Sequence, residues 1–472
     1  FTLSPANASF SGSGNLKADS YQMFGTVSNV TGANFNGTAV YTGSLAVAPL
    51  AVQVSSSQVS KVYDGSATMN GLVLAFNPVA LAGDNVSVTG SGAFASRNVG
   101  SNLSYTVSGL SLSGADASNY VLSGGASSFS GTNGQILAKT VILTPQAVSK
   151  VYDGNTLATA NLSQFSSQLG VAGDTVTAIA LNFDDKNVGT GKNLTPSGVV
   201  INDGNGGNNY NIVYANASLG TVTRLNSVSW VGGVTGNWFD PANWVGGAVP
   251  DLSNVANVLI PSGVTVSFNN TVTAPAQSGP VSIDSLGGAS GSLSQSAGTL
   301  NVGAGGISLT TLVQTDGTLT SLGPVNLSAF VQQGGTTTVT GNATLGALTQ
   351  DNGTLTVGGS MTVNSNLTQT AGNTTVTGNT TVAGNTTVSG NTTTGNLSTT
   401  NANVTGGNTN VTGNSTTTGN LSVTGGNVTV TGSTMAGNLS INGGNTSVGG
   451  NTTVQGDASL SGNITTGNLS TT

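Results

Sequence analysis

Apolar residues in the second half of the chain recur every six positions, within phrases rich in Gly, Asn and Thr. Segment 372–394 contains GNTTVT, GNTTVA and GNTTVS in succession, which places Val376, Val382 and Val388 six apart. A longer period, of about 18 residues, separates five Gln-x-x-Gly phrases, which begin at Gln295, Gln314, Gln332, Gln350 and Gln369. Such self-similarity is the signature of a solenoid. Because this period is too short for a helix pair with its turns, each repeat predicts one three-sided coil of a parallel β-helix.

The residue types of the repeats fit this assignment. β-branched Thr and Val favour strands, whereas Gly and Asn tolerate the left-handed backbone conformation that tight corners need. One coil buries too little apolar surface to fold alone, so coils have to stack. We therefore predict about 12 coils over residues 251–472. We expect a right-handed helix, with a left-handed hexapeptide helix as the alternative for residues 372–394.

The last residues repeat an earlier phrase. The chain ends in GNLSTT, which also occurs at 395–400. A solenoid normally needs a divergent capping coil to protect its final edge. We therefore expect the solenoid to be truncated at this end and the chain to be a segment of a longer protein.

The first half alternates apolar and polar residues in short runs and contains a second repeat. The phrase KVYDG at 61–65 recurs at 150–154, and the later phrases AGD, NVG and NY follow in the same order and at nearly the same offset in both copies. A duplication of this length predicts two β-sandwich-like modules, at 49–138 and 139–224. Residues 1–48 alternate in a similar way without KVYDG, and we expect a partial module there.

The KVYDG phrases favour a structural interpretation. We interpret Tyr63 and Tyr152 as core or corner aromatic residues. Asp-Gly pairs are typical of tight turns, and they follow the two tyrosines at Asp64, Gly65, Asp153 and Gly154. The alternative is that the motif contacts a ligand.

All three tryptophans lie between the modules and the solenoid, within residues 225–250. Trp230, Trp238 and Trp244 form a W-x7-W-x5-W pattern. One interpretation is a hydrophobic plug that caps the first coil and joins it to the preceding module. The other is a platform on which sugar rings stack, because aromatic faces bind sugars well.

Composition excludes several classes of function. The chain contains no Cys and no His, which removes Ser-His and Cys-His catalysis and the usual zinc and copper sites. Every Lys and Arg lies at or before Arg224, and the net charge is −7. We therefore expect no binding to nucleic acid or to anionic membrane surfaces. No apolar run of the sequence is long enough to span a bilayer, and we expect no membrane insertion and no cofactor.

Three minor alternatives concern particular side chains. A polysaccharide-active β-helix needs clustered carboxylates, whereas Asp284, Asp316 and Asp351 are spaced by distances along the chain that are not whole coils. The loop at Asp203 superficially resembles a calcium loop, yet it lacks the closing bidentate acid. Outward rows of Thr suit a binder of ice or crystal surfaces, and Met435 interrupts such a row.

The combination of features resembles one family of proteins. Tandem KVYDG modules of about 90 residues, a tryptophan-marked junction and a Gly/Asn/Thr-rich β-helix are similar to the filamentous-haemagglutinin-like adhesins of bacterial two-partner secretion. This resemblance covers nearly the whole chain, although the family's amino-terminal secretion domain is missing. It implies export through a Gram-negative outer membrane with an outer-membrane transporter as partner. It also implies a place at the cell surface.

We therefore expect an all-β, elongated, extracellular and non-enzymatic segment. Its predicted function is that of a stalk and adhesive surface in cell attachment or biofilm cohesion, with a host or bacterial glycan or matrix component as partner. The alternative is a purely structural spacer whose binding domain lies outside this segment. Open strand edges also make self-association an option.

Overall fold

The computed structural model describes residues 3–32, 35–57, 59–268, 280–287 and 291–472. Strands dominate this part of the chain, which confirms the all-β prediction. The chain divides into two compact units, and the division runs through the second module. Each unit is described by itself.

The first unit contains the amino-terminal region, all of module 1 and part of module 2; it comprises Phe1–Gln146, Thr159–Leu181 and Thr195–Asn216. In the amino-terminal region, β2 (Asp19–Gly32) and β3 (Phe35–Val47) form an antiparallel hairpin. The short strand β1 (Ser4–Pro5) pairs with β2.

Module 1 consists of two sheets. The first has the order β5-β10-β8-β7, with bounds Ser60–Val62, Ser128–Leu137, Gly100–Ser113 and Ser87–Phe94. The second has the order β6-β4-β9, with bounds Leu74–Asn77, Leu50–Ser56 and Tyr120–Leu122. Alternate side chains of β8 point into the core, where Tyr105 and Val107 are buried. This is the period-two pattern of a half-buried strand.

Module 2 repeats the sheet plan. Its four-stranded sheet has the order β12-β16-β14-β13, with bounds Val148–Val151, Ala217–Thr223, Gly189–Asn202 and Thr175–Phe183. A second, two-stranded sheet pairs β11 (Lys139–Leu143) in parallel with β15 (Tyr210–Tyr214). The sandwich-like sheets agree with the prediction for both modules.

The modules differ at one place. In module 2, the helix α1 (Leu162–Leu169) is capped by the Asn161 side chain, which accepts a hydrogen bond from Gln164 N, and it buries Phe165 in the core. Module 1 has strand β6 at the corresponding position. A hollow of about 260 Å³ lies beside β4 there. The duplication in the sequence does not predict this difference.

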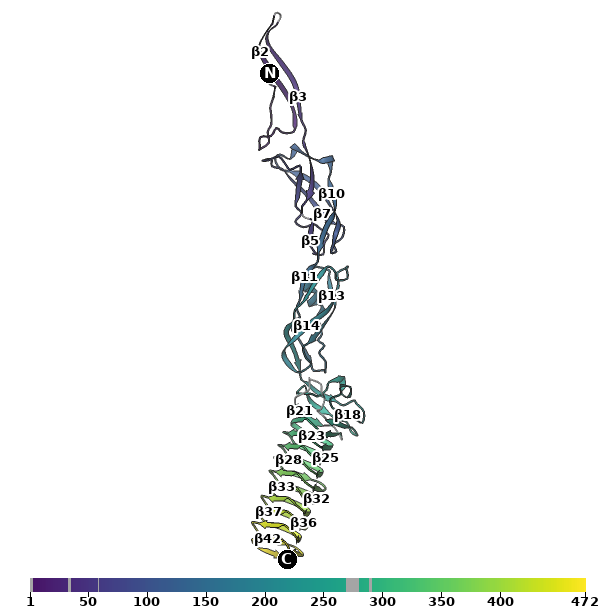
Figure 1. Ribbon diagram of the computed structural model, residues 1–472, viewed down its shortest axis with the longest axis vertical. Helices are drawn as coiled ribbons and strands as arrows, with labels where there is room; N and C mark the ends of the chain where they lie inside the picture. The colour runs from purple at the N-terminus through teal and green to yellow at the C-terminus, as the bar shows by residue number, and fades with distance from the viewer. Residues whose placement is uncertain (1–2, 33–34, 58, 269–279, 288–290) are drawn as a thin grey trace. The chain divides into compact units, whose positions relative to one another are not determined.

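The second unit contains the rest of module 2 and the solenoid; it comprises Ala147–Ala158, Asn182–Leu194 and Ala217–Thr472. The solenoid sheet runs from β17 (Leu225–Ser229) to β43 (Leu469–Thr471). Within the described residues, the 27 strands of this sheet stack in about ten turns. Figure 1 shows the stack in its green to yellow part.

The first coils of the solenoid are longer than the sequence period. Leu225 pairs with Val255, and Asn257 pairs with Ser285. Both steps are wider than the spacing between successive Gln-x-x-Gly phrases. Later coils keep close to that spacing, as the pairing of Val325 with Ala343 shows. The handedness stays a prediction.

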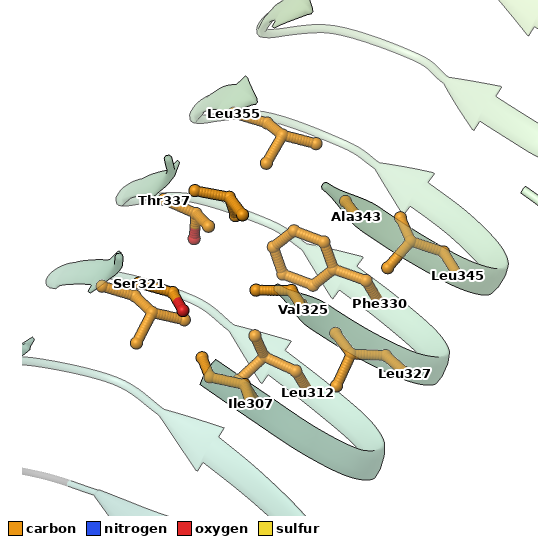
Figure 2. Close-up of a pocket in the computed structure, with 12 residues that line it drawn as sticks. Ile307, Leu312, Ser321, Val325, Leu327, Phe330, Thr337, Ala343, Leu345 and Leu355 are labelled. Carbon is orange, nitrogen blue, oxygen red and sulfur yellow. The ribbon is translucent and has the colours of Figure 1, made fainter. Parts of the chain in front are cut away.

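One coil illustrates how the sequence fills the interior. Strand β25 (Val325–Gln332) and strand β26 (Thr336–Val339) alternate between buried and outward positions. Figure 2 shows Phe330 and Thr337 turned into the space between the walls. The next coil repeats this arrangement in register, since Val325 pairs with Ala343.

The valines that recur every six residues lie on strands of the solenoid, as the sequence predicts. Val376 ends β31 (Asn373–Val376), whereas Val382 and Val388 lie in β32 (Thr380–Val388). All three side chains are buried. The residue pattern therefore identified successive faces of one coil.

Candidate functional site

The three tryptophans form one buried aromatic cluster. Trp230 packs edge-on against Trp244 with 5.1 Å between ring centroids, and Trp238 lies 5.2 Å from Trp244 and from Phe268. Exposure is 4% for Trp230, 0% for Trp238 and 1% for Trp244. Edge-to-face packing of this kind adds to the stabilisation that burial provides.

The indole N–H groups are satisfied inside the protein. Trp230 donates to Gly233 O at 2.9 Å, Trp238 to Pro250 O at 3.0 Å, and Trp244 to Trp238 O at 2.6 Å. A sugar ring needs an exposed aromatic face on which to stack, and none of the three tryptophans offers one. The geometry therefore fits the cap interpretation and does not fit the sugar platform.

Each KVYDG phrase forms a tight turn closed by its own lysine. Lys61 Nζ lies 2.7 Å from Asp64 Oδ1 and also donates to Ser66 O and Thr68 O. Gly65 has φ +82°, the left-handed conformation that favours glycine. Lys150 makes the equivalent contact with Asp153 at 2.7 Å, and Gly154 has φ +80°.

The carboxylate of this turn is held in its charged form. Although burial opposes ionisation, hydrogen bonds from Lys61 and from Ser66 hold the pKa of Asp64 below its usual value. The turn is thus completed by an ammonium group surrounded by oxygen atoms. Because the lysine ammonium occupies the place beside the Asp64 carboxylate, this geometry does not favour a ligand site at the Asp-Gly turn.

The tyrosines of the two phrases point away from the turn and are buried. The hydroxyl of Tyr63 donates to Asp174 Oδ2 at 2.7 Å, as does the hydroxyl of Tyr210. Burial and the hydrogen bond to Asp174 raise the pKa of Tyr63 to about 12. Burial raises the pKa of Tyr152, which also contacts Asp251 at 3.0 Å. These phenols remain protonated donors at every physiological pH.

The five glutamines of the Gln-x-x-Gly phrases form a ladder inside the solenoid. All are at most 1% exposed. From Gln314 onward, each Nε2 donates to the Oε1 of the glutamine one coil earlier, at 3.3, 3.0, 2.9 and 2.8 Å. A buried amide is costly unless its partners are present, so the ladder requires neighbouring coils to stay in register.

The glycine of each phrase completes this arrangement. Gly317, Gly353 and Gly372 have φ between +80° and +88°, and their carbonyls accept hydrogen bonds from the glutamine of the same phrase. A Cβ at Gly317 meets the carbonyl oxygen of Gly298 at 2.6 Å. The fixed spacing of Gln and Gly therefore reflects a corner that needs both a left-handed backbone and close contact between coils.

Asp284, Asp316 and Asp351 of the solenoid each have their own partner. Asp284 pairs with Arg224 at 2.8 Å, Asp316 accepts a hydrogen bond from Gly317 N, and Asp351 accepts one from Thr370 Oγ1. In the part of the chain that the structure describes, no three acidic side chains are grouped so that they could hold a metal ion.

The loop at Asp203 uses its carboxylate internally. Asp203 Oδ1 accepts from the backbone N–H of Asn205 and of Gly207, and Oδ2 accepts from Asn209 N. Although burial opposes ionisation, these backbone donors lower the pKa of Asp203. Its oxygens are thus occupied by N–H groups, which does not fit a calcium ligand.

Outward threonines of the solenoid form in-register rows. In one of them, strand pairing aligns Thr344, Thr362, Thr381, Ser398, Thr416, Met435 and Thr453. Met435 is 43% exposed and interrupts the hydroxyls of this row. The row presents a polar, regular face.

Four residues that make contacts at the module ends were not predicted from the sequence: Asp174, Asn209, Asp251 and Asn254. The first two lie in the repeated AGD and NY phrases, so the repeat marked their positions without indicating their contacts. The other two belong to a loop without any repeat. All four are buried polar residues that receive hydrogen bonds.

The fold and these contacts define a class of protein, a tandem array of β modules continued by a β-solenoid. Within it, residues 46–128 and 138–218 match the YDG domain family. No curated protein and no solved structure matches the chain. Within the described residues, no helix has the length and apolar character needed to cross a membrane.

Proposed function

We propose that this chain is a segment of a secreted bacterial adhesin, in which the solenoid acts as a stalk and polar surface and the YDG modules extend it. The observation that carries this proposal is the ladder construction of the solenoid. Its interior is tied coil to coil by buried glutamines, and its outside presents in-register rows of Thr, Ser and Asn. Such a rod gives reach and a repetitive polar face.

Two further features support the proposal. The grouped carboxylates that polysaccharide cleavage needs do not occur among the solenoid aspartates described above. Two-partner export to a Gram-negative cell surface, with an outer-membrane transporter, follows from the resemblance of the sequence. The partner we propose is a surface glycan or matrix component.

The test compares the full chain with a variant lacking residues 415–451. Strand register pairs Ser415 with Thr434 and Thr434 with Thr452, so this deletion removes two whole coils and leaves the remaining register intact. We expect both proteins to bind bacterial cells or a glycan array. We expect the shortened one to attach cells less well when displayed on a cell surface.

A second candidate function is that of a pure spacer. The deep burial of the tryptophans favours it, because the strongest candidate for a sugar contact is used to cap the rod. If the full chain, shown to be folded by circular dichroism, binds neither cells nor glycans, the spacer is the better description.

A further inference from the structure

Inside the first unit, module 1 meets module 2 through a shared apolar core and a small set of polar contacts. Tyr63 donates to Asp174 Oδ2 at 2.7 Å. Val99 N donates to Asn209 Oδ1 at 2.9 Å, and Asn209 Nδ2 donates back to Asn98 Oδ1 at 3.2 Å. Thus the Asp174 carboxylate of module 2 accepts a hydrogen bond from the YDG tyrosine of module 1, and the Asn209 side chain forms hydrogen bonds with the NVG phrase of module 1.

Inside the second unit, module 2 meets the start of the solenoid through the same set. Tyr152 contacts Asp251 Oδ1 at 3.0 Å. Val188 N donates to Asn254 Oδ1 at 2.8 Å, and Asn254 Nδ2 donates to Asn187 Oδ1 at 2.9 Å. Each contact of the first junction has its counterpart here.

A basic residue completes both junctions. Arg97 and Lys186 each stand directly before the NVG phrase. Arg97 Nη2 lies 3.7 Å from Asp174 Oδ1, and Lys186 Nζ lies 2.6 Å from Asp251 Oδ2. The receiving carboxylates are only 1% and 2% exposed. A carboxylate buried so deeply needs a cation and hydrogen-bond donors, and both come from the preceding module.

The receiving residues have unrelated sequence contexts. Asp174 and Asn209 lie far apart in the sequence of a β module. Asp251 and Asn254 lie within one turn of each other, in the loop before β19 (Val255–Leu259). Duplication explains why the donors recur, but it does not explain why the solenoid presents the same two acceptors. What the two junctions share is the arrangement of hydrogen bonds to a buried Asp and an Asn, and not the sequence around these acceptors.

The same acceptors occur a third time, at the other end of module 1. Tyr120 donates to Asp84 Oδ2 at 2.8 Å, as Tyr210 does to Asp174. The other carboxylate oxygen accepts from Ser11 at 2.6 Å. The second acceptor, the side chain of Asn119, receives Ala18 N at 3.0 Å. In the amino-terminal region, Ser11 therefore donates to the carboxylate where the other two junctions have a tyrosine.

We propose that the YDG motif is a docking element that locks each module to the unit after it. The docking end comprises the YDG tyrosine, the basic residue and the Asn-Val pair of NVG. Its acceptor is a buried Asp with an Asn amide. The partner it fits is any β unit that presents this acceptor pair; in module 1 the corresponding pair, Asp84 and Asn119, is already engaged by the amino-terminal region. This proposal is independent of what the protein adheres to.

The test uses the full chain, which has no cysteine, so spin labels can be placed freely. Cysteines at the exposed positions Ser108 and Ala178 report on the first junction, and cysteines at Thr190 and Thr344 report on the second. Distance distributions are measured by double electron–electron resonance. Tyr63→Phe is expected to broaden only the first distribution.

Two further variants test whether the effect is specific to each junction. Tyr152→Phe is expected to broaden only the second distribution. Tyr105→Phe changes a buried tyrosine of the module 1 core outside the junctions and is expected to broaden neither. Circular dichroism checks that each variant is folded. Unchanged distributions in both junction variants would overturn the proposal.

Amide exchange gives a readout that does not depend on the labels. Asn209→Ala is expected to accelerate exchange at Val99 N by about tenfold, and Asn254→Ala at Val188 N by a similar factor, since each removes one hydrogen-bond acceptor. If each variant leaves the amide of its own junction protected, or unfolds the chain globally, these residues are general core residues and the docking proposal is wrong.

Discussion

The YDG modules and the solenoid use opposite strategies to stay ordered. The junction between the modules relies on a few residues that are distant in sequence, such as Tyr63 with Asp174. The solenoid relies on many equivalent contacts between neighbouring coils, such as the glutamine ladder. The difference teaches that one lost side chain affects a whole module junction, whereas in the solenoid its effect stays close to its own coil.

The largest effect is expected from the buried tryptophan cluster at the start of the solenoid, which depends on a few large side chains, as the module junctions do. Trp238→Ala removes a fully buried indole and is expected to cost about 3–5 kcal/mol of unfolding free energy. Hydrogen exchange is expected to show loss of protection in the first coils, with coils beyond Gln350 still protected. Uniform loss of protection along the rod would contradict the idea of local effects.

A smaller effect is expected from a glycine of the solenoid. Gly335→Ala puts a Cβ 2.6 Å from Gly317 O at φ +72°, and we expect a loss of about 2–3 kcal/mol. Gly263→Ala is the matched control, because Gly263 has φ +74° but nothing within 4 Å of its Cβ position. Denaturant unfolding measures both. Equal losses would show that backbone conformation, and not contact between coils, sets the cost.

Substitutions in the glutamine ladder test how much the contacts between neighbouring coils contribute to stability. Gln332→Val removes one side-chain hydrogen bond to each of the two neighbouring coils, and we expect a loss of about 1–3 kcal/mol. Gln369→Val is the control, because the next coil already carries Val388 at this position. It is expected to cost less in thermal unfolding. A larger loss for the control would mean that the ladder is not cooperative.

The smallest effect concerns pH at the module junction. The pKa of Tyr63 is raised above its ordinary value of 10 to about 12, so its contribution to stability is complete below pH 10 and is lost as pH rises towards 12. At pH 11 we expect Tyr63 to contribute a loss of about 1 kcal/mol, so Tyr63→Phe is expected to reduce the total loss by about this amount. Tyr152 and Tyr210, whose pKa values are also raised, still contribute in the variant. Asp174, Arg97 and Asp203 are the charged groups that act on the phenol of Tyr63. Chemical denaturation at pH 8 and pH 11 measures the loss.

Much of the fold was predictable because it repeats. The six-residue spacing of Val376, Val382 and Val388 indicates the faces of a coil directly, and the KVYDG repeat indicates two modules. The difference between the modules was not predictable from the duplication, because the segment after KVYDG forms strand β6 in one copy and helix α1 in the other. There, local sequence decides the structure.

The candidate sites were harder to predict than the fold. The glutamines marked the repeat, but their inward direction depends on partners one coil away. Asp251 and Asn254 carry no signal in the sequence, since their role appears only when Tyr152 and Val188 approach them in space. The aromatic pattern was compatible with both a cap and a sugar platform, and only burial separates the two.

The variable length of the coils has a consequence for the gene. Met361 pairs with Thr380, Thr380 with Leu397, and Leu397 with Ser415, so successive coils differ slightly in length. The inward pattern survives these changes because the corners absorb the extra or missing residue. Gain or loss of a single codon is therefore tolerable at a corner, whereas the same change within a face turns the following side chains inside out.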